Sequence, residues 1–208
     1  MKKKHILWVI IIIIIVAAVA IAFSVFNKSK AQYKQTESQV IYNYYTFNRQ
    51  QDNLWYLDLS IKNAPYIIPF YYTPFETENI TINDSAVLSL ANFLHENPGG
   101  RVYISVDPQA SSKDVIASVE IARLLGSKYN IFNFDVKSAI SKPYNDTLYP
   151  VITCLNSTSS TLVIMIEDNG PNRVAGLKNC ILIRASSPDE IIRVADAFSF
   201  RMLGIIRP

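Results

Sequence analysis

The sequence predicts an α/β protein, in which an N-terminal transmembrane helix is followed by one extracytoplasmic α/β domain with a mixed sheet. Three observations predict it. Residues 6–26 carry no charge, no Pro and no Gly, residues 40–72 are rich in aromatic side chains, and residues 84–206 alternate between helix and strand patterns. An uncharged run of 21 residues has the length that crosses a bilayer as a helix. Alternation of helices with strands is typical of an α/β sheet.

The charges that flank the apolar run do not fix its orientation by themselves. Three lysines precede the run and three follow it, so the positive-inside rule only slightly favours a cytoplasmic N-terminus. A cleaved signal peptide is the alternative, but its apolar region is usually about 7–15 residues long. We therefore expect residues 1–5 to be a cytoplasmic flank, 6–26 the helix in the cytoplasmic (plasma) membrane, 27–39 a polar tether and 40–208 the extracytoplasmic domain.

Two kinds of residue favour a domain outside the cytoplasm. Cys154 and Cys180 are the two cysteines of the chain and have no metal-type spacing. They are expected to form a structural disulfide in an oxidising compartment, and two buried thiols are the alternative. Acceptor motifs for N-glycosylation occur at five asparagines: Asn27, Asn79, Asn83, Asn145 and Asn156. The sequence therefore predicts a single-pass glycoprotein.

The net charge of +3 comes from the membrane flank. Residues 1–30 contain five lysines and no acidic residue, which leaves 15 basic and 17 acidic residues in the rest of the chain. Nucleic-acid binding needs a basic surface, and the domain composition does not supply one. We expect the lipid bilayer and other envelope proteins as partners, no nucleic acid, no cofactor and no metal. The oligomeric state is left open.

The domain is expected to open with an aromatic β-meander over residues 40–72. Apolar and polar side chains alternate over 55–61, which predicts a strand with one buried face. Residues 66–72 follow a turn and form its partner, with Pro69 at an edge or a bulge. The aromatic side chains could form a platform that stacks sugars or binds peptides. The alternative is that they pack in a half-buried sheet.

Helix and strand patterns alternate through the rest of the domain. The apolar run 161–166 is predicted to be a central strand covered on both faces, and residues 101–134 a parallel β-α-β unit. Ser187, Pro188 and Glu190 predict a capping box. In order, we expect a helix at 85–96, a strand at 101–106, a helix from Ser111 to Gly126, a strand at 131–134, a polar loop at 138–149, a short β-like segment at 150–154, strands at 161–166 and 180–184 separated by a turn at 167–171, and a helix ending at Gly204.

Three carboxylates follow predicted strands and are the candidate site residues. Asp107 follows one strand, and Glu167 and Asp168 follow another. Ligands of α/β sheets bind at such strand ends, so these residues could serve an anchored hydrolase as a general base or metal site. Ordinary turn carboxylates are the alternative.

Other catalytic signatures are missing from the sequence. No P-loop, dinucleotide or Gly-x-Ser-x-Gly motif occurs. His95 is the only histidine beyond the membrane flank, and we expect it to be exposed at a helix C-terminus, where it favours the helix dipole. We therefore expect a non-enzymatic binding or assembly module of the cell envelope, with the anchored hydrolase as the competing function.

Five short segments of the domain stand out together: 101–108, 150–154, 179–183, 189–196 and 203–206. In these segments the domain resembles small, uncharacterised membrane-anchored proteins of archaeal cell envelopes. The resemblance spans about residues 66–206. It implies a location in the envelope and a shared fold, but no activity.

Overall fold

The computed structural model describes residues 33–61, 63–145 and 148–207. The expected flank at 1–5, the expected membrane helix at 6–26 and the acceptor Asn27 lie outside the described residues. Within the described ranges, every helix is too short or too polar to cross a bilayer.

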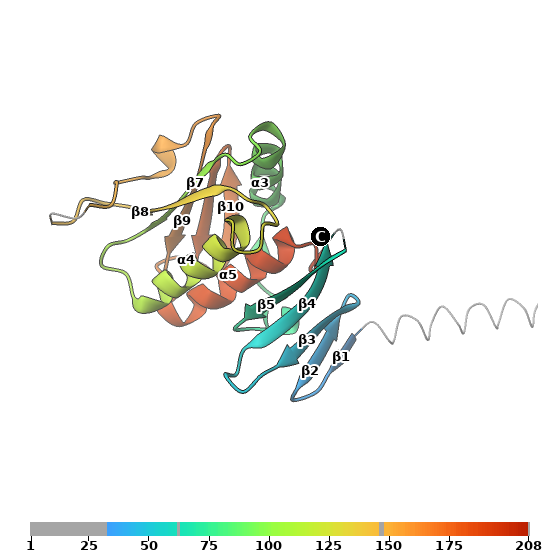
Figure 1. Ribbon diagram of the computed structural model, residues 1–208. Coiled ribbons are helices and arrows are strands. Elements are labelled where there is room, and N and C mark those ends of the chain that lie inside the picture. The colour runs from blue at the N-terminus through green and yellow to red at the C-terminus, as the bar shows by residue number, and fades with distance from the viewer. Residues whose placement is uncertain (1–32, 62, 146–147, 208) are drawn as a thin grey trace, which may run out of the picture.

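The chain has an α/β fold with an antiparallel sheet and a mixed sheet (Figure 1). The antiparallel sheet is the expected meander, with its strands in sequence order. It begins earlier than residue 40, because β1 lies within the segment expected to be a polar tether. Its strands are β1 (Tyr33–Gln35), β2 (Gln39–Tyr42), β3 (Tyr45–Arg49), β4 (Trp55–Ile61) and β5 (Ala64–Phe70).

The mixed sheet has the order β6-β10-β11-β9-β7-β8. Only β10 and β11 pair antiparallel in it. Its strands are β6 (Thr81–Ile82), β7 (Arg101–Val106), β8 (Asp135–Ile140), β9 (Thr161–Glu167), β10 (Arg173–Leu177) and β11 (Cys180–Arg184). The helices are α2 (Pro74–Thr77), α3 (Asp84–Glu96), α4 (Ser112–Leu125) and α5 (Pro188–Met202), with a 3-10 turn at Cys154–Asn156.

The predicted parallel β-α-β unit is confirmed as β7-α4-β8, but the position predicted for its second strand is wrong. The strand covers Asp135–Ile140 rather than 131–134, so part of the predicted polar loop 138–149 belongs to it. Phe134 is buried in the core, where its ring lies 5.6 Å from that of Phe93. Its amide donates to the Leu125 carbonyl instead of entering a strand ladder.

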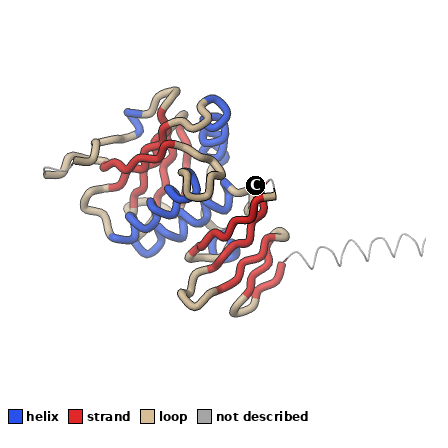
Figure 2. The backbone as a smooth tube through the Cα atoms, in the orientation of Figure 1, coloured by secondary structure: helices blue, strands red, loops and turns tan. Residues whose placement is uncertain are grey.

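Strand β9 is central and buried on both faces, as predicted. Leu162, Ile164 and Ile166 face the core that α3, α4 and α5 build. Val163 and Met165 face the opposite side, where they pack with Ile152 and both cysteines. The second cover is therefore a loop, and all three long helices lie on one side of the sheet (Figure 2).

Helix α5 lies between the mixed sheet and the meander (Figure 1). Phe198 belongs to the core of the mixed sheet, whereas Phe200 belongs to the core of the meander. The Phe200 ring centroid is 4.5 Å from that of Phe70 and 5.6 Å from that of Phe47. The aromatic residues at these meander positions therefore pack in a core, which favours the packing interpretation over a binding platform.

The ends of the helices follow the sequence signals only in part. Ser111 caps α4 by accepting from the Lys113 amide, and His95 is exposed in the last turn of α3, both as expected. Pro188 begins α5 and Gly204 follows it with a φ of 72°. The capping box predicted for α5 is wrong, because the Ser187 side chain makes no capping hydrogen bond.

Asp196 on α5 ties the helix to the end of the meander. Its side chain is fully buried, and Oδ2 accepts from the amides of Tyr71 and Tyr72, both at 2.9 Å. Burial raises the pKa of this carboxyl well above its usual value, and the two amide donors only partly oppose that effect.

Replacing Phe200 with Ala is expected to lower the free energy of unfolding by roughly 3–5 kcal/mol, because it opens a cavity between α5 and the meander. Urea unfolding of the purified chain, followed by tryptophan fluorescence, measures the change. Leu177→Ala is the control, since Leu177 is 71% exposed and its loss should cost no more than about 0.5 kcal/mol. A cost below about 1 kcal/mol for Phe200→Ala would contradict the shared core.

Asp196→Asn is expected to become increasingly stabilising, relative to the wild type, as the pH rises. The native Asp196 carboxyl has the higher pKa, so the native state binds more protons than the unfolded chain between the two pKa values. The wild type therefore loses stability as the pH rises from about 3.9, the pKa expected in the unfolded chain, through the native pKa. Asn does not titrate, and its amide oxygen can still accept from Tyr71 and Tyr72. Unfolding measured at several pH values should show the difference growing, and a difference independent of pH would contradict the assignment.

Candidate functional site

The predicted candidate carboxylates lie at the carboxyl ends of two neighbouring parallel strands. Val106 at the end of β7 is in register with Ile166 near the end of β9. Asp107 and Glu167 therefore come next on adjacent strands, and Asp168 follows. The fold thus brings the candidates to the same end of the mixed sheet, at the carboxyl ends of its parallel strands, which is where α/β sheets bind ligands.

Asp107 and Glu167 are each engaged by a different cation. Asp107 Oδ2 lies 2.8 Å from Lys142 Nζ, and its Oδ1 accepts from the Gln109 amide. The hydrogen bond from Lys142 lowers the pKa of the Asp107 carboxyl. Glu167 Oε2 lies 2.7 Å from Arg184 Nε on the neighbouring strand. A carboxylate that is already held by a cation is a weak general base, because the cation stabilises its charged form.

A fourth carboxylate, Asp114, lies near these strand ends and is not one of the candidates predicted from the sequence. Asp114 is buried in the first turn of α4, and Ser111 Oγ donates to its Oδ2 at 2.6 Å. Among the described residues, its buried Oδ1 has no hydrogen-bond partner. Burial raises the pKa of Asp114, and the nearby charge of Asp168 adds to the rise. The spacing of Ser111 and Asp114 in the sequence is that of a capping box at the start of α4, and only the fold reveals that Asp168 lies near enough for its charge to act on Asp114.

The carboxylates of the described residues do not gather into a set of three or more His, Cys, Asp or Glu that could hold a metal ion. Asp107 and Glu167 are ion-paired with different cations, Lys142 and Arg184, while Asp168 lies near enough to Asp114 for its charge to act on that carboxyl. The carboxyl ends of these strands therefore carry two ion-paired carboxylates and one buried acid, Asp114.

The predicted disulfide between Cys154 and Cys180 is present. Cys154 lies in the 3-10 turn rather than at the end of a strand, and Cys180 opens β11, with 5.3 Å between their Cα atoms. The bond fastens the loop before β9 across the face of the mixed sheet that carries no helix. Ser105 Oγ strengthens the same attachment by donating to the Ile152 carbonyl at 2.7 Å. The disulfide and this hydrogen bond hold the loop over a face of the sheet that no helix covers.

Four of the expected glycosylation acceptors lie in described parts of the chain, and all four are exposed: Asn79, Asn83, Asn145 and Asn156. Asn79 Oδ1 accepts from Arg193 Nη1, and Asn156 Oδ1 accepts from the Thr153 amide. A glycan is attached through Nδ2, so both hydrogen bonds leave the reactive atom available.

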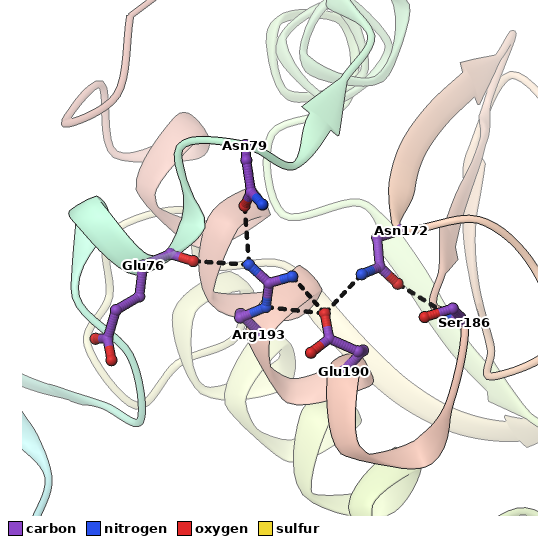
Figure 3. Close-up of polar contacts among 6 residues, drawn as sticks. All are labelled: Glu76, Asn79, Asn172, Ser186, Glu190 and Arg193. Atoms are coloured by element: carbon purple, nitrogen blue, oxygen red, sulfur yellow. Dashed lines mark hydrogen bonds and ion pairs between the residues drawn. The ribbon is translucent and has the colours of Figure 1, made fainter.

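Arg193 of α5 lies at the centre of a polar network that the sequence did not predict (Figure 3). Its Nη1 donates to the Glu76 carbonyl at 2.7 Å and to Asn79, while Nε and Nη2 bind Glu190 Oε2. Glu190 also accepts from Asn172 Nδ2, and Asn172 Oδ1 accepts from the Ser186 amide. Glu190 is thus committed to Arg193 and Asn172 rather than to the cap of α5. The network attaches α5 to the segment that holds Glu76 and Asn79 on one side and to Asn172 on the other.

Comparison with known protein families, with curated proteins and with solved structures finds no match to this chain.

Replacing both cysteines with serine is expected to lower the free energy of unfolding by roughly 3–4 kcal/mol. The bond closes a loop with a sequence separation of 26, which is the main variable in the chain-entropy model. Urea unfolding of the purified double variant measures the loss. Wild-type chain kept in reductant should behave like the variant, and an unchanged unfolding midpoint in both would contradict a structural role for the bond.

Proposed function

We propose that this chain is a membrane-anchored binding or assembly module of the cell envelope, with its N-terminus in the cytoplasm and its α/β domain outside. The observation that carries the proposal is the disulfide between Cys154 and Cys180. Structural disulfides persist in oxidising compartments and are rare in the cytosol. The uncharged run at residues 6–26 supplies a segment able to hold such a domain at the membrane.

The acceptor asparagines agree with this topology. Asn79, Asn83, Asn145 and Asn156 are exposed, so a glycosylation enzyme could reach them on a translocated domain. We propose the glycosylated state together with the location. The resemblance of residues 66–206 to archaeal envelope proteins points to the same compartment.

A non-enzymatic role is supported by the way the strand-end carboxylates are used. Asp107 neutralises Lys142, and Glu167 neutralises Arg184 across the paired strands β9 and β11, so both carboxylates serve the fold. The competing function is a hydrolase anchored at the same membrane. One observation favours it, because the raised pKa of Asp114 beside Asp168 is the property of a general acid.

The topology can be tested by labelling intact cells with a membrane-impermeant maleimide. We expect no labelling of the wild type until a reductant is added, because both cysteines are in the disulfide, and labelling afterwards. Labelling before reduction would contradict the disulfide in cells.

Two single-cysteine variants, made in the background that lacks both native cysteines, separate location from bond formation. Leu177→Cys places a thiol at an exposed position of the domain and should label in intact cells. Lys3→Cys places one in the expected cytoplasmic flank and should label only after the cells are opened. If Leu177→Cys labels only in opened cells, the proposed location is wrong.

A further inference from the structure

Strand β8 is an edge of the mixed sheet with part of its backbone open. It pairs with β7 on one side. The Asp135 amide donates to Gly100, so residues 135, 137 and 139 direct their backbone groups towards β7. On the other side, the Ile140 amide donates to Pro150 and its carbonyl accepts from Ile152. Val136 and Ser138 direct their backbone groups to that same outer side, where no described residue pairs with them.

An apolar groove runs beside this edge on the helix-facing side of the sheet. It lies between α4 and β8 and has a volume of about 210 Å³. Val115 and Val119 of α4 are 51% and 47% exposed there, although α4 buries the rest of its apolar face. Val136, Ser138 and Ile140 form the strand side of the groove. The groove therefore offers an apolar surface directly alongside open backbone groups.

The opposite face of the sheet carries an excess of positive charge at β8 and the neighbouring β7. Arg101 Nε and Lys137 Nζ lie 3.0 and 2.9 Å from the single carboxylate of Asp135. Both cations are about half exposed, and their hydrogen bonds lower the pKa of Asp135. A second hollow beside them is lined by Tyr103 and Tyr149. One carboxylate serves two cations, so an acidic group would be favoured on this face.

We propose that β8 is the docking site of an extended segment of a partner protein, which adds to the sheet as a strand with apolar residues over α4 and acidic residues beside Arg101 and Lys137. Alternate side chains of a strand point to opposite faces, so a segment with alternating apolar and acidic residues meets both surfaces at once. The open groups of Val136 and Ser138 supply its main-chain hydrogen bonds, as in other cases of strand addition.

A second copy of this chain is a poorer occupant. The antiparallel register that pairs Val136 of one copy with Ser138 of the other uses all the open groups of both strands. It also places Lys137 directly opposite Lys137, and like charges at that position are destabilising. Edge-strand lysines commonly oppose self-association in this way. An acidic partner strand turns the same lysine into an attractive contact.

This inference names the partner class of the proposed binding module and rests on that proposed function, but its test uses the purified full chain in detergent and is independent of where cells place the domain. The probe is the capped peptide Val-Glu-Val-Glu-Val-Thr-Val. Two control peptides accompany it: Val-Val-Glu-Thr-Glu-Val-Val, which breaks the alternation, and Val-Lys-Val-Lys-Val-Thr-Val, which reverses the charge. We expect the probe to bind at least tenfold more tightly than either control, and to slow hydrogen exchange at the Val136 and Ser138 amides at least tenfold.

Two variants locate the binding. Ser138→Pro removes an outward N–H that β7 does not use, a change that edge strands tolerate, and Val119→Asp places a carboxylate in the groove. Each should weaken probe binding at least tenfold, while Leu177→Asp, at an exposed position on β10, should leave it unchanged. If Ser138→Pro fails to fold, Val119→Asp still decides the matter.

Three results would overturn the proposal: equal binding of the three peptides, binding unaffected by Val119→Asp, or dimerisation of the chain through β8 without peptide binding. Failure here alongside successful labelling of Leu177→Cys in intact cells would remove the docking site and leave the proposed location standing. If labelling places the domain inside the cell and the probe peptide still binds, the proposed location is wrong and the docking site stands.

Discussion

The burial of α5 on two sides is the constraint on which the rest of the structure depends. Most of its 15 residues are buried, from Ile191 to Phe200 with the exception of Arg193. A helix whose middle turns are buried on nearly every side needs packing partners on nearly every side. The mixed sheet covers one side through Phe198, and the meander covers the other through Phe200. Neither sheet could lose this helix without exposing its own core.

The same arrangement explains the polar residues of α5 and the uneven covering of the mixed sheet. Asp196 and Arg193 interrupt the apolar surface of the helix, and each holds backbone of the chain that leads from the meander into the mixed sheet. With α3, α4 and α5 on one face, the other face is left to the loop that the disulfide fastens. That loop bonds to β8 at Ile140, and no described residue pairs with the outward backbone groups of Val136 and Ser138.

The spacing of apolar residues predicted those strands and helices in which buried positions are apolar and exposed positions are polar. Strands β4, β9 and β11 and helices α3, α4 and α5 all show the expected apolar patterns, and the pairing of the two cysteines followed from their number and spacing. Strand β8 was misplaced because an edge strand needs few apolar residues, and the residues from Ser138 onward were predicted to be a polar loop. Strand β10 was missed because Gly176 breaks the pattern. A Cβ at Gly176 would lie 2.5 Å from the Ser85 carbonyl oxygen, so α3 requires a glycine there.

The polar positions of the candidate site were harder to predict than the fold. The sequence placed Asp107, Glu167 and Asp168 at strand ends, but it contains no information on which cations Asp107 and Glu167 would meet. Asp114 and Asp196 were missed because nothing in the local pattern distinguishes a buried carboxylate from an exposed one. Glu190 fits a capping box by spacing, yet Arg193 and Asn172 offer it stronger, charge-assisted partners.

Native-state hydrogen exchange on the purified full chain tests most directly whether α5 joins both sheets into one cooperative unit. The amides of Leu57 in β4 and Ile164 in β9 lie in central strands of the two sheets. If α5 is shared, both should open with the same free energy, within roughly 1 kcal/mol, because neither sheet unfolds alone. If the Leu57 amide exchanges through an opening that costs several kcal/mol less than that of Ile164, the meander unfolds while β9 stays folded, and α5 does not join the two sheets into one unit.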